Sequence, residues 1–248
     1  MNIINKVRKN TPLIHHLTNQ VVMNFTANGL LAFGGAPIMA KEHKEVAEMA
    51  SIADGVLINI GTMVESELEA MVIAGKKANE RSIPVTLDPV GIAATSFRQT
   101  SVERLLTEVS FTAIKGNAGE MAHLVNVAWT TRGVDSVDGT VEQLEEIAVN
   151  IANKYKTIAI ITGEVDIISD GTKIFRNDSG HAMLTKITGA GCLLGSIVTA
   201  SLAVSDDSLQ AAYEAVRFYG LAAEQAIQHE HVKGSGSFIP AFLDELQQ

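Results

Sequence analysis

The chain has 248 residues, of which 46% are hydrophobic and 19% are charged, a balance typical of a globular protein with a sizeable core and contrary to long disorder. Its net charge of -9 argues against a nucleic-acid partner, which needs a basic face. The polar start and the lack of a long apolar run argue against a signal peptide and a membrane span, and the single cysteine excludes an internal disulfide, so we expect a cytoplasmic protein.

Short β-rich runs alternate with helical patterns through the middle of the chain. Strands are expected at residues 55–61, 84–90, 111–114 and 157–162. Helices are expected at residues 63–81 and 101–106, from Ala118 onward, and at 141–154. This alternation predicts βαβ units, and therefore an α/β fold with a doubly wound, mostly parallel central sheet and helices on both faces.

The pattern changes after residue 162. Three short segments, 166–169, 173–176 and 181–184, are separated by the turn pairs Asp170-Gly171 and Ser179-Gly180. This spacing predicts β-hairpins, and so antiparallel strands at one edge of the sheet. Three more helices are expected at 191–204, 208–229 and 238–246. Because no repeat or low-complexity linker interrupts the pattern, we predict one domain over residues 1–248.

Each of the four expected strands is followed by polar residues or glycine. The segments are Asn59-Ile60-Gly61-Thr62, Asp88-Pro89-Val90-Gly91, Lys115-Gly116-Asn117 and Thr162-Gly163-Glu164. In open parallel sheets, ligands bind beyond the carboxyl ends of the strands. The recurrence therefore predicts that the ligand site lies at the carboxyl ends of these strands.

A glycine-containing turn, Thr188-Gly189-Ala190-Gly191, precedes an apolar run that begins at Cys192. Two glycines let the backbone turn tightly and expose its N–H groups, and the start of a helix adds partial positive charge. Such a turn suits a transferring phosphoryl group, although by itself it is more often an ordinary helix start. The chain has no Walker loop.

The thiol of Cys192 lies at this expected helix start. A helix N-terminus lowers the pKa of a thiol, so Cys192 is a candidate base or nucleophile. The alternative is a small, inert, buried side chain, which is the commoner role of a free cysteine.

Two acidic residues follow strands. Asn117-Ala118-Gly119-Glu120 has the spacing of an ordinary capping box, and the alternative is a glutamate directed at a Mg²⁺–phosphate complex. Asp88, before Pro89, is a second candidate for organising a metal or phosphate, and its alternative role is turn formation.

Together these motifs resemble the ribokinase-like superfamily. Thr188–Cys192 occupies the place of its anion-hole motif, and Asn117–Glu120 resembles its N-x-x-E motif. The last anion-hole position is usually Asp there, and a Cys is similar to the hydroxyethylthiazole kinases of thiamine salvage. Further matching motifs, which extend the resemblance over essentially the whole chain, are His16–Val22 with Asn24 and Thr26, Ala36–Met39, Asp88–Gly91, Ile114–Asn117 and Ile161–Asp166.

The resemblance implies ATP- and Mg²⁺-dependent phosphorylation of the hydroxyl group of 4-methyl-5-(2-hydroxyethyl)thiazole. It implies a homotrimer with active sites at the subunit interfaces. The positions that match the family's thiazole site are Met39, Gly189 and Asn19. The positions assigned to ATP are Lys115, Thr162, Asn117 and Thr188, and those assigned to Mg²⁺ are Glu120 and Asp88. Cys192 matches the catalytic position, beside the anion hole formed by Gly189, Ala190 and Gly191.

The sequence departs from the family pattern at two places. The family often has Arg where Lys115 stands, and lysine keeps the charge but loses bidentate geometry. The segment Lys233–Phe238 replaces the common Gly-Pro-Gly-Ser-Phe. Two other functions stay open, a kinase for the hydroxymethylpyrimidine of the same pathway and a non-catalytic nucleotide or thiazole sensor. Cys192 and the segment Thr18-Asn19-Gln20 argue against the first, and the complete set of charged and glycine positions argues against the second.

Overall fold

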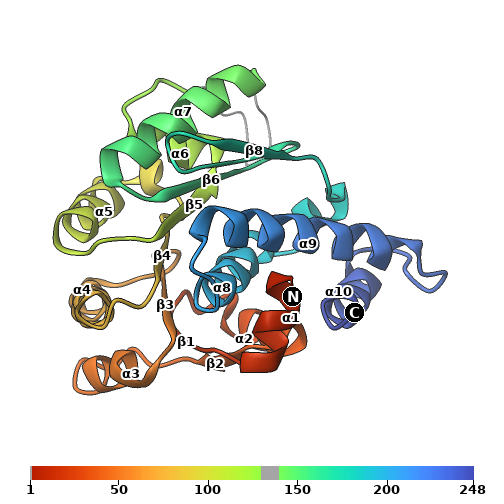
Figure 1. Cartoon of the computed structure of the whole chain (residues 1–248), viewed down its shortest axis with the longest axis horizontal. Helices are drawn as coiled ribbons and strands as arrows, with labels where there is room; N and C mark the ends of the chain where they lie inside the picture. The colour runs from red at the N-terminus through yellow and green to blue at the C-terminus, as the bar shows by residue number, and fades with distance from the viewer. Residues whose placement is uncertain (1, 130–139) are drawn as a thin grey trace.

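The computed structural model describes residues 2–129 and 140–248, and these form one eight-stranded sheet between two layers of helices (Figure 1). The strands are β1 (Leu13–Leu17), β2 (Ala36–Ile38), β3 (Gly55–Asn59), β4 (Val85–Asp88), β5 (Ala113–Asn117), β6 (Ile158–Thr162), β7 (Asp166–Ser169) and β8 (Ile174–Asn177). Their order is β2-β1-β3-β4-β5-β6-β7-β8.

The first six strands are parallel, and β7 and β8 add antiparallel to β6. The expected mostly parallel α/β sheet with an antiparallel edge is therefore confirmed. Parallel pairing places the carboxyl ends of β1, β3, β4, β5 and β6 side by side at one end of the sheet. The register pairs Asn59 directly with Asp88 and Asn117 with Thr162, so the polar strand ends become neighbours.

Helices cover both faces of the sheet (Figure 1). One face is covered by α3 (Val46–Ile52), α4 (Glu65–Glu80), α5 (Ser96–Glu108), α6 (Ala118–Leu124) and α7 (Val141–Tyr155). The other is covered by α1 (Ile3–Asn10), α2 (Met23–Phe33), α8 (Ala190–Leu202), α9 (Ser208–Gln228) and α10 (Ser235–Glu245). Two short 3₁₀ turns, η1 (Ile92–Ala94) and η2 (Ala182–Lys186), lie in the connections.

Alternate side chains of each central strand enter the two helical layers. In β3, Val56 and Ile58 pack in the layer of α3 and α4, whereas Leu57 lies against Gly195 of α8. Helix α8 is buried almost throughout, which its apolar sequence predicts, and it crosses the middle of the sheet. Its first turn therefore lies above the strand ends.

The first 54 residues contain five elements beyond those predicted from the sequence. In β1, the histidines His15 and His16 interrupt the apolar run, yet both are buried. His16 is held by hydrogen bonds to Ile14 O (2.8 Å) and to Ser196 Oγ (2.7 Å) of α8. Because these two buried polar side chains interrupt the apolar run, the hydrophobic pattern does not predict this central strand.

The strand expected at 181–184 is absent, and this prediction is wrong. Residues Ala182–Lys186 form η2 instead, and the Met183 N–H donates to the His181 Nδ1 at its start. Gly180 has φ +146°, so the chain turns away from β8 before a third antiparallel strand can pair. The hairpin of β7 and β8 is confirmed.

Candidate active site

Three neighbouring strand ends supply the buried polar centre of the site. Asn59, Asp88 and Lys115 come from β3, β4 and β5, and each is at most 3% exposed. They lie on the α8 side of the sheet: a Cβ on Gly195 would lie 3.8 Å from Asp88 Oδ2, and one on Gly191 would lie 3.4 Å from Lys115 Nζ. Three of the four strand-end segments therefore contribute one residue each to a cluster beneath the first turn of α8.

Asp88 and Lys115 form a buried ion pair. Lys115 Nζ lies 3.4 Å from Asp88 Oδ2. Burial raises the pKa of Asp88 to about 6, although Lys115 and the Asn59 amide lower it. Burial also lowers the pKa of Lys115, but the negative charges of Asp88 and Glu120 outweigh it and the net shift is upward. Lys115 is therefore a fixed positive charge directly below the glycine turn.

A chain of side-chain amides leads from this pair to the cysteine. Asn59 Nδ2 donates to Asp88 Oδ2 (2.8 Å), and Asn19 Nδ2 donates to Asn59 Oδ1 (2.9 Å). Asn19 Nδ2 also donates to Cys192 Sγ (3.4 Å). Residues far apart in the sequence thus form one hydrogen-bonded line along the strand ends.

The glycine turn begins α8 at Ala190. Gly189 has φ +94°, and a Cβ there would lie 2.5 Å from Val22 Cγ1, so both conformation and space require glycine. The first intrahelical donor is Leu193 N–H, bonded to Gly189 O (2.9 Å). The N–H groups of Ala190, Gly191 and Cys192 belong to the helix start, where donors have no partner within the helix. With Gly191 exposed, the turn can receive an anion from solvent.

The expected lowering of the Cys192 pKa is wrong. Burial is the largest influence and raises the pKa of the thiol above its ordinary value, and the charge of Asp88 acts in the same direction. Lys115 and the two amides oppose the shift without reversing it. Cys192 therefore carries its proton at neutral pH, and the helix start does not make it a thiolate.

Glu120 holds two strand-end loops together. Its Oε2 accepts from the Asn117 N–H (2.9 Å), and Asn117 Oδ1 accepts from the Glu120 N–H (2.9 Å). This is the expected capping box, and it is confirmed. Glu120 Oε1 also accepts from the Gly91 N–H (2.8 Å), so the carboxylate lies beside the loop that follows Asp88.

The carboxylates fit a magnesium ion that keeps its waters and phosphate ligands. The described residues contain no group of three His, Cys, Asp or Glu side chains that could hold a metal by themselves. Asp88 Oδ1 is buried without a hydrogen-bond partner among them. Mg²⁺ is commonly bound through one or two carboxylates together with water and substrate phosphates, and Asp88 and Glu120 suit that pattern.

Three other predicted site residues lie outside this hydrogen-bonded cluster. Met39 follows β2, half-buried, and Thr188 is exposed before the turn. Thr162 Oγ1 donates to Gly116 O (3.4 Å) on the neighbouring strand. Within the described ranges, no hydrogen bond joins these three residues to Asp88, Lys115 or Cys192.

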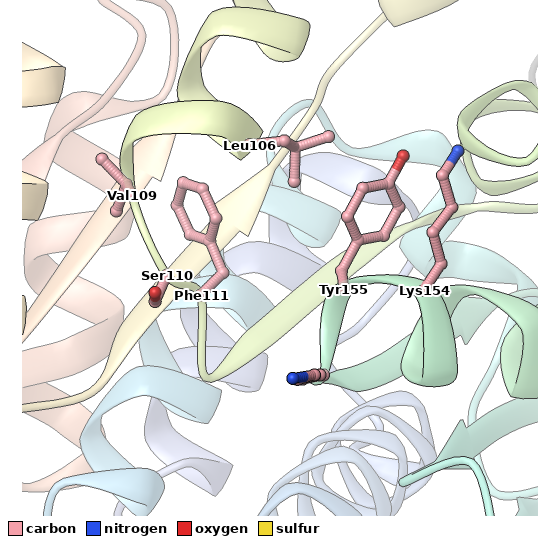
Figure 2. Close-up of a pocket in the computed structure, with 7 residues that line it drawn as sticks. Leu106, Val109, Ser110, Phe111, Lys154 and Tyr155 are labelled. Carbon is pink, nitrogen blue, oxygen red and sulfur yellow. The ribbon is translucent and has the colours of Figure 1, made fainter.

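A separate hollow lies at the amino ends of β5 and β6, opposite the carboxyl ends that carry the cluster (Figure 2). Phe111 and Tyr155 line it, and Lys154 Nζ and Tyr155 Oη both donate to Leu124 O (3.0 and 3.1 Å). These two polar side chains thus hold α6 and α7 together, and the hollow shares no residue with the cluster below α8.

Comparison with known proteins decides the family. Residues 4–248 match the sequence profile described as the hydroxyethylthiazole kinase family. Hydroxyethylthiazole kinase 1 of Oceanobacillus iheyensis is 52% identical over 249 residues, covering 100% of this chain and 96% of the relative. The chain belongs to the hydroxyethylthiazole kinase family. The resemblance read from the motifs and the expected enzyme class, a kinase, are therefore confirmed.

Solved structures agree with the hydroxyethylthiazole kinase assignment. The hydroxyethylthiazole kinase protein of Pyrococcus horikoshii is 38% identical, with a TM-score of 0.90 over 99% of this chain and 91% of that one. A ribokinase-like superfamily protein of Enterococcus faecalis has a TM-score of 0.66 at 12% identity, over 97% of this chain and 88% of that one. The second likeness concerns the fold alone, and it confirms the expected ribokinase-like fold.

Two residues that hold the site together in this hydroxyethylthiazole kinase family member are not marked by the sequence. Asn59 ends an expected strand, and its two contacts arise only within the sheet, where β3 pairs with β4, which carries Asp88, and with β1, which precedes Asn19. Arg98 of α5 donates to Ile60 O (3.1 Å), to Val90 O and to Gly61 O, and so ties the loops after β3 and β4 together. No sequence signal marks Arg98, because its partners are backbone carbonyls.

Proposed function

We propose that this chain is a single-domain cytoplasmic kinase that transfers the γ-phosphoryl group of ATP to the hydroxyl of 4-methyl-5-(2-hydroxyethyl)thiazole in thiamine salvage. The observation that carries the proposal is the buried ammonium of Lys115 below the open first turn of α8, in a member of this family. A fixed cation and free N–H groups at one point are what a transferring phosphoryl group requires.

In the proposed reaction, the oxygen of the alcohol forms a bond to the γ-phosphorus of ATP, the bond from that phosphorus to ADP breaks, and the hydroxyl proton passes to an oxygen of the transferred phosphoryl group. The N–H groups of Gly189–Cys192 bind the moving phosphoryl oxygens. Lys115 neutralises phosphate charge, and Asn117, Thr162 and Thr188 bind the rest of the nucleotide. Asp88 and Glu120 would hold Mg²⁺ through water. When bound, the ion would neutralise charge on the ATP phosphates.

The alcohol is proposed to lie between Met39, Asn19 and Gly189, with its hydroxyl near Cys192. Because the Cys192 thiol is protonated at neutral pH, its proposed part is to line and orient the alcohol rather than to act as a strong base. Phosphoryl transfer depends mainly on positioning and charge, so a phosphate oxygen suffices as the weak base that accepts the hydroxyl proton.

A homotrimer with the pocket at subunit interfaces belongs to the same proposal. It is supported by large apolar side chains that are exposed shortly after Asn19 and on α2, since Val21 is 67% and Leu31 is 58% exposed. Light scattering after size-exclusion chromatography tests it, and a mass of one chain would contradict it.

One assay separates the candidate functions. Purified protein is given ATP and Mg²⁺, and ADP release is measured with the thiazole alcohol and, separately, with hydroxymethylpyrimidine. The proposal expects release that depends on the thiazole alcohol. Release with the pyrimidine alone would identify the other kinase of the pathway. Binding of either compound without ADP release would identify a sensor.

A further inference from the structure

We propose that Asn59 is a positioning residue of this site, because its amide fixes Asp88 on one side and, through Asn19, Cys192 on the other. This inference rests on the proposed function, since the reaction supplies its main readout. Asn59 is fully buried, so it acts on its neighbours and touches no substrate.

The orientation of the Asn59 amide is set by the backbone. The Gly61 N–H donates to Asn59 Oδ1 (3.0 Å), and a backbone N–H can only donate, so Oδ1 must face the loop. Asn19 Nδ2 donates to the same oxygen (2.9 Å). The NH₂ group of Asn59 is therefore turned toward Asp88, where Nδ2 donates to Oδ2 (2.8 Å).

This orientation decides which oxygen of Asp88 is available. Oδ2 is held by Asn59 Nδ2 and by Lys115 Nζ, while Oδ1 has no hydrogen-bond partner among the described residues. A buried carboxylate oxygen without a partner is costly in a finished fold. Asn59 therefore presents Oδ1, in a fixed position, to whatever enters the site.

The same amide decides how Cys192 is held. With Asn59 Oδ1 as its acceptor, the NH₂ group of Asn19 is placed where it also donates to Cys192 Sγ (3.4 Å). Gly61 leaves the space for this, since a Cβ on it would lie 2.8 Å from Asn19 Nδ2. Sγ is thus an acceptor toward Asn19, and the thiol proton is free to point toward the alcohol.

A purely structural role is the alternative, because any buried amide with three partners also stabilises the fold. The two roles differ in their effect on Cys192, the single cysteine of the chain. The groups that face its thiol are Asp88, Lys115, Asn19 and Asn59. The pH midpoint of its alkylation by iodoacetamide therefore reports the arrangement of the amides independently of turnover.

The test compares full-length wild type, Asn59→Leu and Asn59→Ser with a control. Leucine keeps the volume without hydrogen bonds, and serine is too short to bridge both neighbours. The control, Ser201→Ala, also removes a buried hydrogen bond, from Ser201 Oγ to Ile197 O (2.9 Å), in the last turn of α8. The readouts are kcat and KM with ATP and the thiazole alcohol, the folded fraction, and the alkylation midpoint of Cys192.

For both Asn59 variants we expect kcat per folded protein to fall about tenfold, with both KM values within about twofold, since ordering rather than contact is lost. The alkylation midpoint should move to higher pH, and Ser201→Ala should change neither quantity. An unchanged alkylation midpoint would overturn the inference. A loss of total activity that is fully accounted for by the loss of folded protein would also overturn it. If Asn59→Leu does not fold, Asn59→Ser decides. A wild type without thiazole-dependent ADP release would refute the proposed function instead, and the alkylation arm would still test Asn59.

Discussion

The carboxylate of Asp88 and the ammonium of Lys115 lie 3.4 Å apart, with 1% and 4% of their side chains exposed. Two neighbouring parallel strands carry them to one point below α8. Removing two charges from water is costly, and their mutual attraction offsets this cost only while both are present. The folded state therefore carries the cost of two buried charges at the place where the reaction is proposed to occur, and each charge needs the other as its partner.

Lys115→Met should destabilise the protein by about 3 kcal/mol at pH 7, because it leaves the buried Asp88 unpaired. The loss should shrink below pH 6, where Asp88, whose pKa is about 6 in the wild type and higher without Lys115, takes up a proton. Urea unfolding at several pH values measures it. The control is Lys77→Met, which breaks an exposed pair with Glu80 and should cost less than about 1 kcal/mol. Equal losses for both variants would contradict the account.

Gly189→Ala should lower kcat about tenfold or more and reduce stability by about 1–3 kcal/mol. Alanine is strained at φ +94°, and its Cβ would displace Val22, so the first turn of α8 must shift. Gly180→Ala is the matched control, since Gly180 also has positive φ but open space around it. Steady-state kinetics and thermal melts of both variants measure the effects, and full activity of Gly189→Ala would exclude the turn as the phosphoryl site.

Glu120→Gln should raise the Mg²⁺ concentration needed for half-maximal rate by about tenfold, because it removes a carboxylate charge proposed to face the ion. Glu67→Gln is the control: Glu67 Oε2 accepts from the Val64 N–H (3.1 Å) and caps α4 as Glu120 caps α6. Titration of Mg²⁺ at saturating ATP measures the effect. The same Mg²⁺ dependence in wild type and Glu120→Gln would leave Glu120 with its capping role alone.

Cys192→Ser should lower kcat, because serine is smaller and changes the acceptor that Asn19 holds beside the alcohol. Since the wild-type thiol is already protonated at neutral pH, the ratio of the two kcat values should be constant from about pH 6 to 8, well below the thiol pKa. Initial rates over this range measure it. An unchanged kcat would remove Cys192 from the mechanism. A ratio of wild-type kcat to Cys192→Ser kcat that rises with pH would instead indicate that the thiolate takes part in the reaction.

Asp166→Asn should flatten the dependence of stability on pH. Burial raises the pKa of Asp166 to about 6, although Asn177 and the Gly163 N–H lower it. With a folded pKa above the unfolded one, the folded state binds more protons between about pH 4 and 6, so stability falls as pH rises through that window. The variant should remove up to ~1.4 kcal/mol per pH unit of this slope. Urea unfolding from pH 4 to 8 checks it, and an unchanged slope would contradict the raised pKa.

The sequence by itself determined the alternation of strands and helices, the polar strand ends and the glycine turn. These are local properties: a buried strand such as Gly55–Asn59 needs an apolar run, and a positive φ at Gly189 needs glycine. The same locality explains the failures. His181–Leu184 has the composition of a strand but lacks a neighbour to pair with, and β1 was hidden because its histidines find partners on distant elements.

Only the tertiary structure decided how the site residues act on one another. Asn19, Asn59, Asp88 and Lys115 are separated by dozens of residues, and parallel strand pairing with α8 above it brings them within hydrogen-bond reach. The Cys192 thiol shows the difference most clearly. Its place at a helix start predicts a lowered pKa, whereas its burial beside a carboxylate raises that pKa. A pKa depends on the dielectric and the charges around a group, and folding alone sets both.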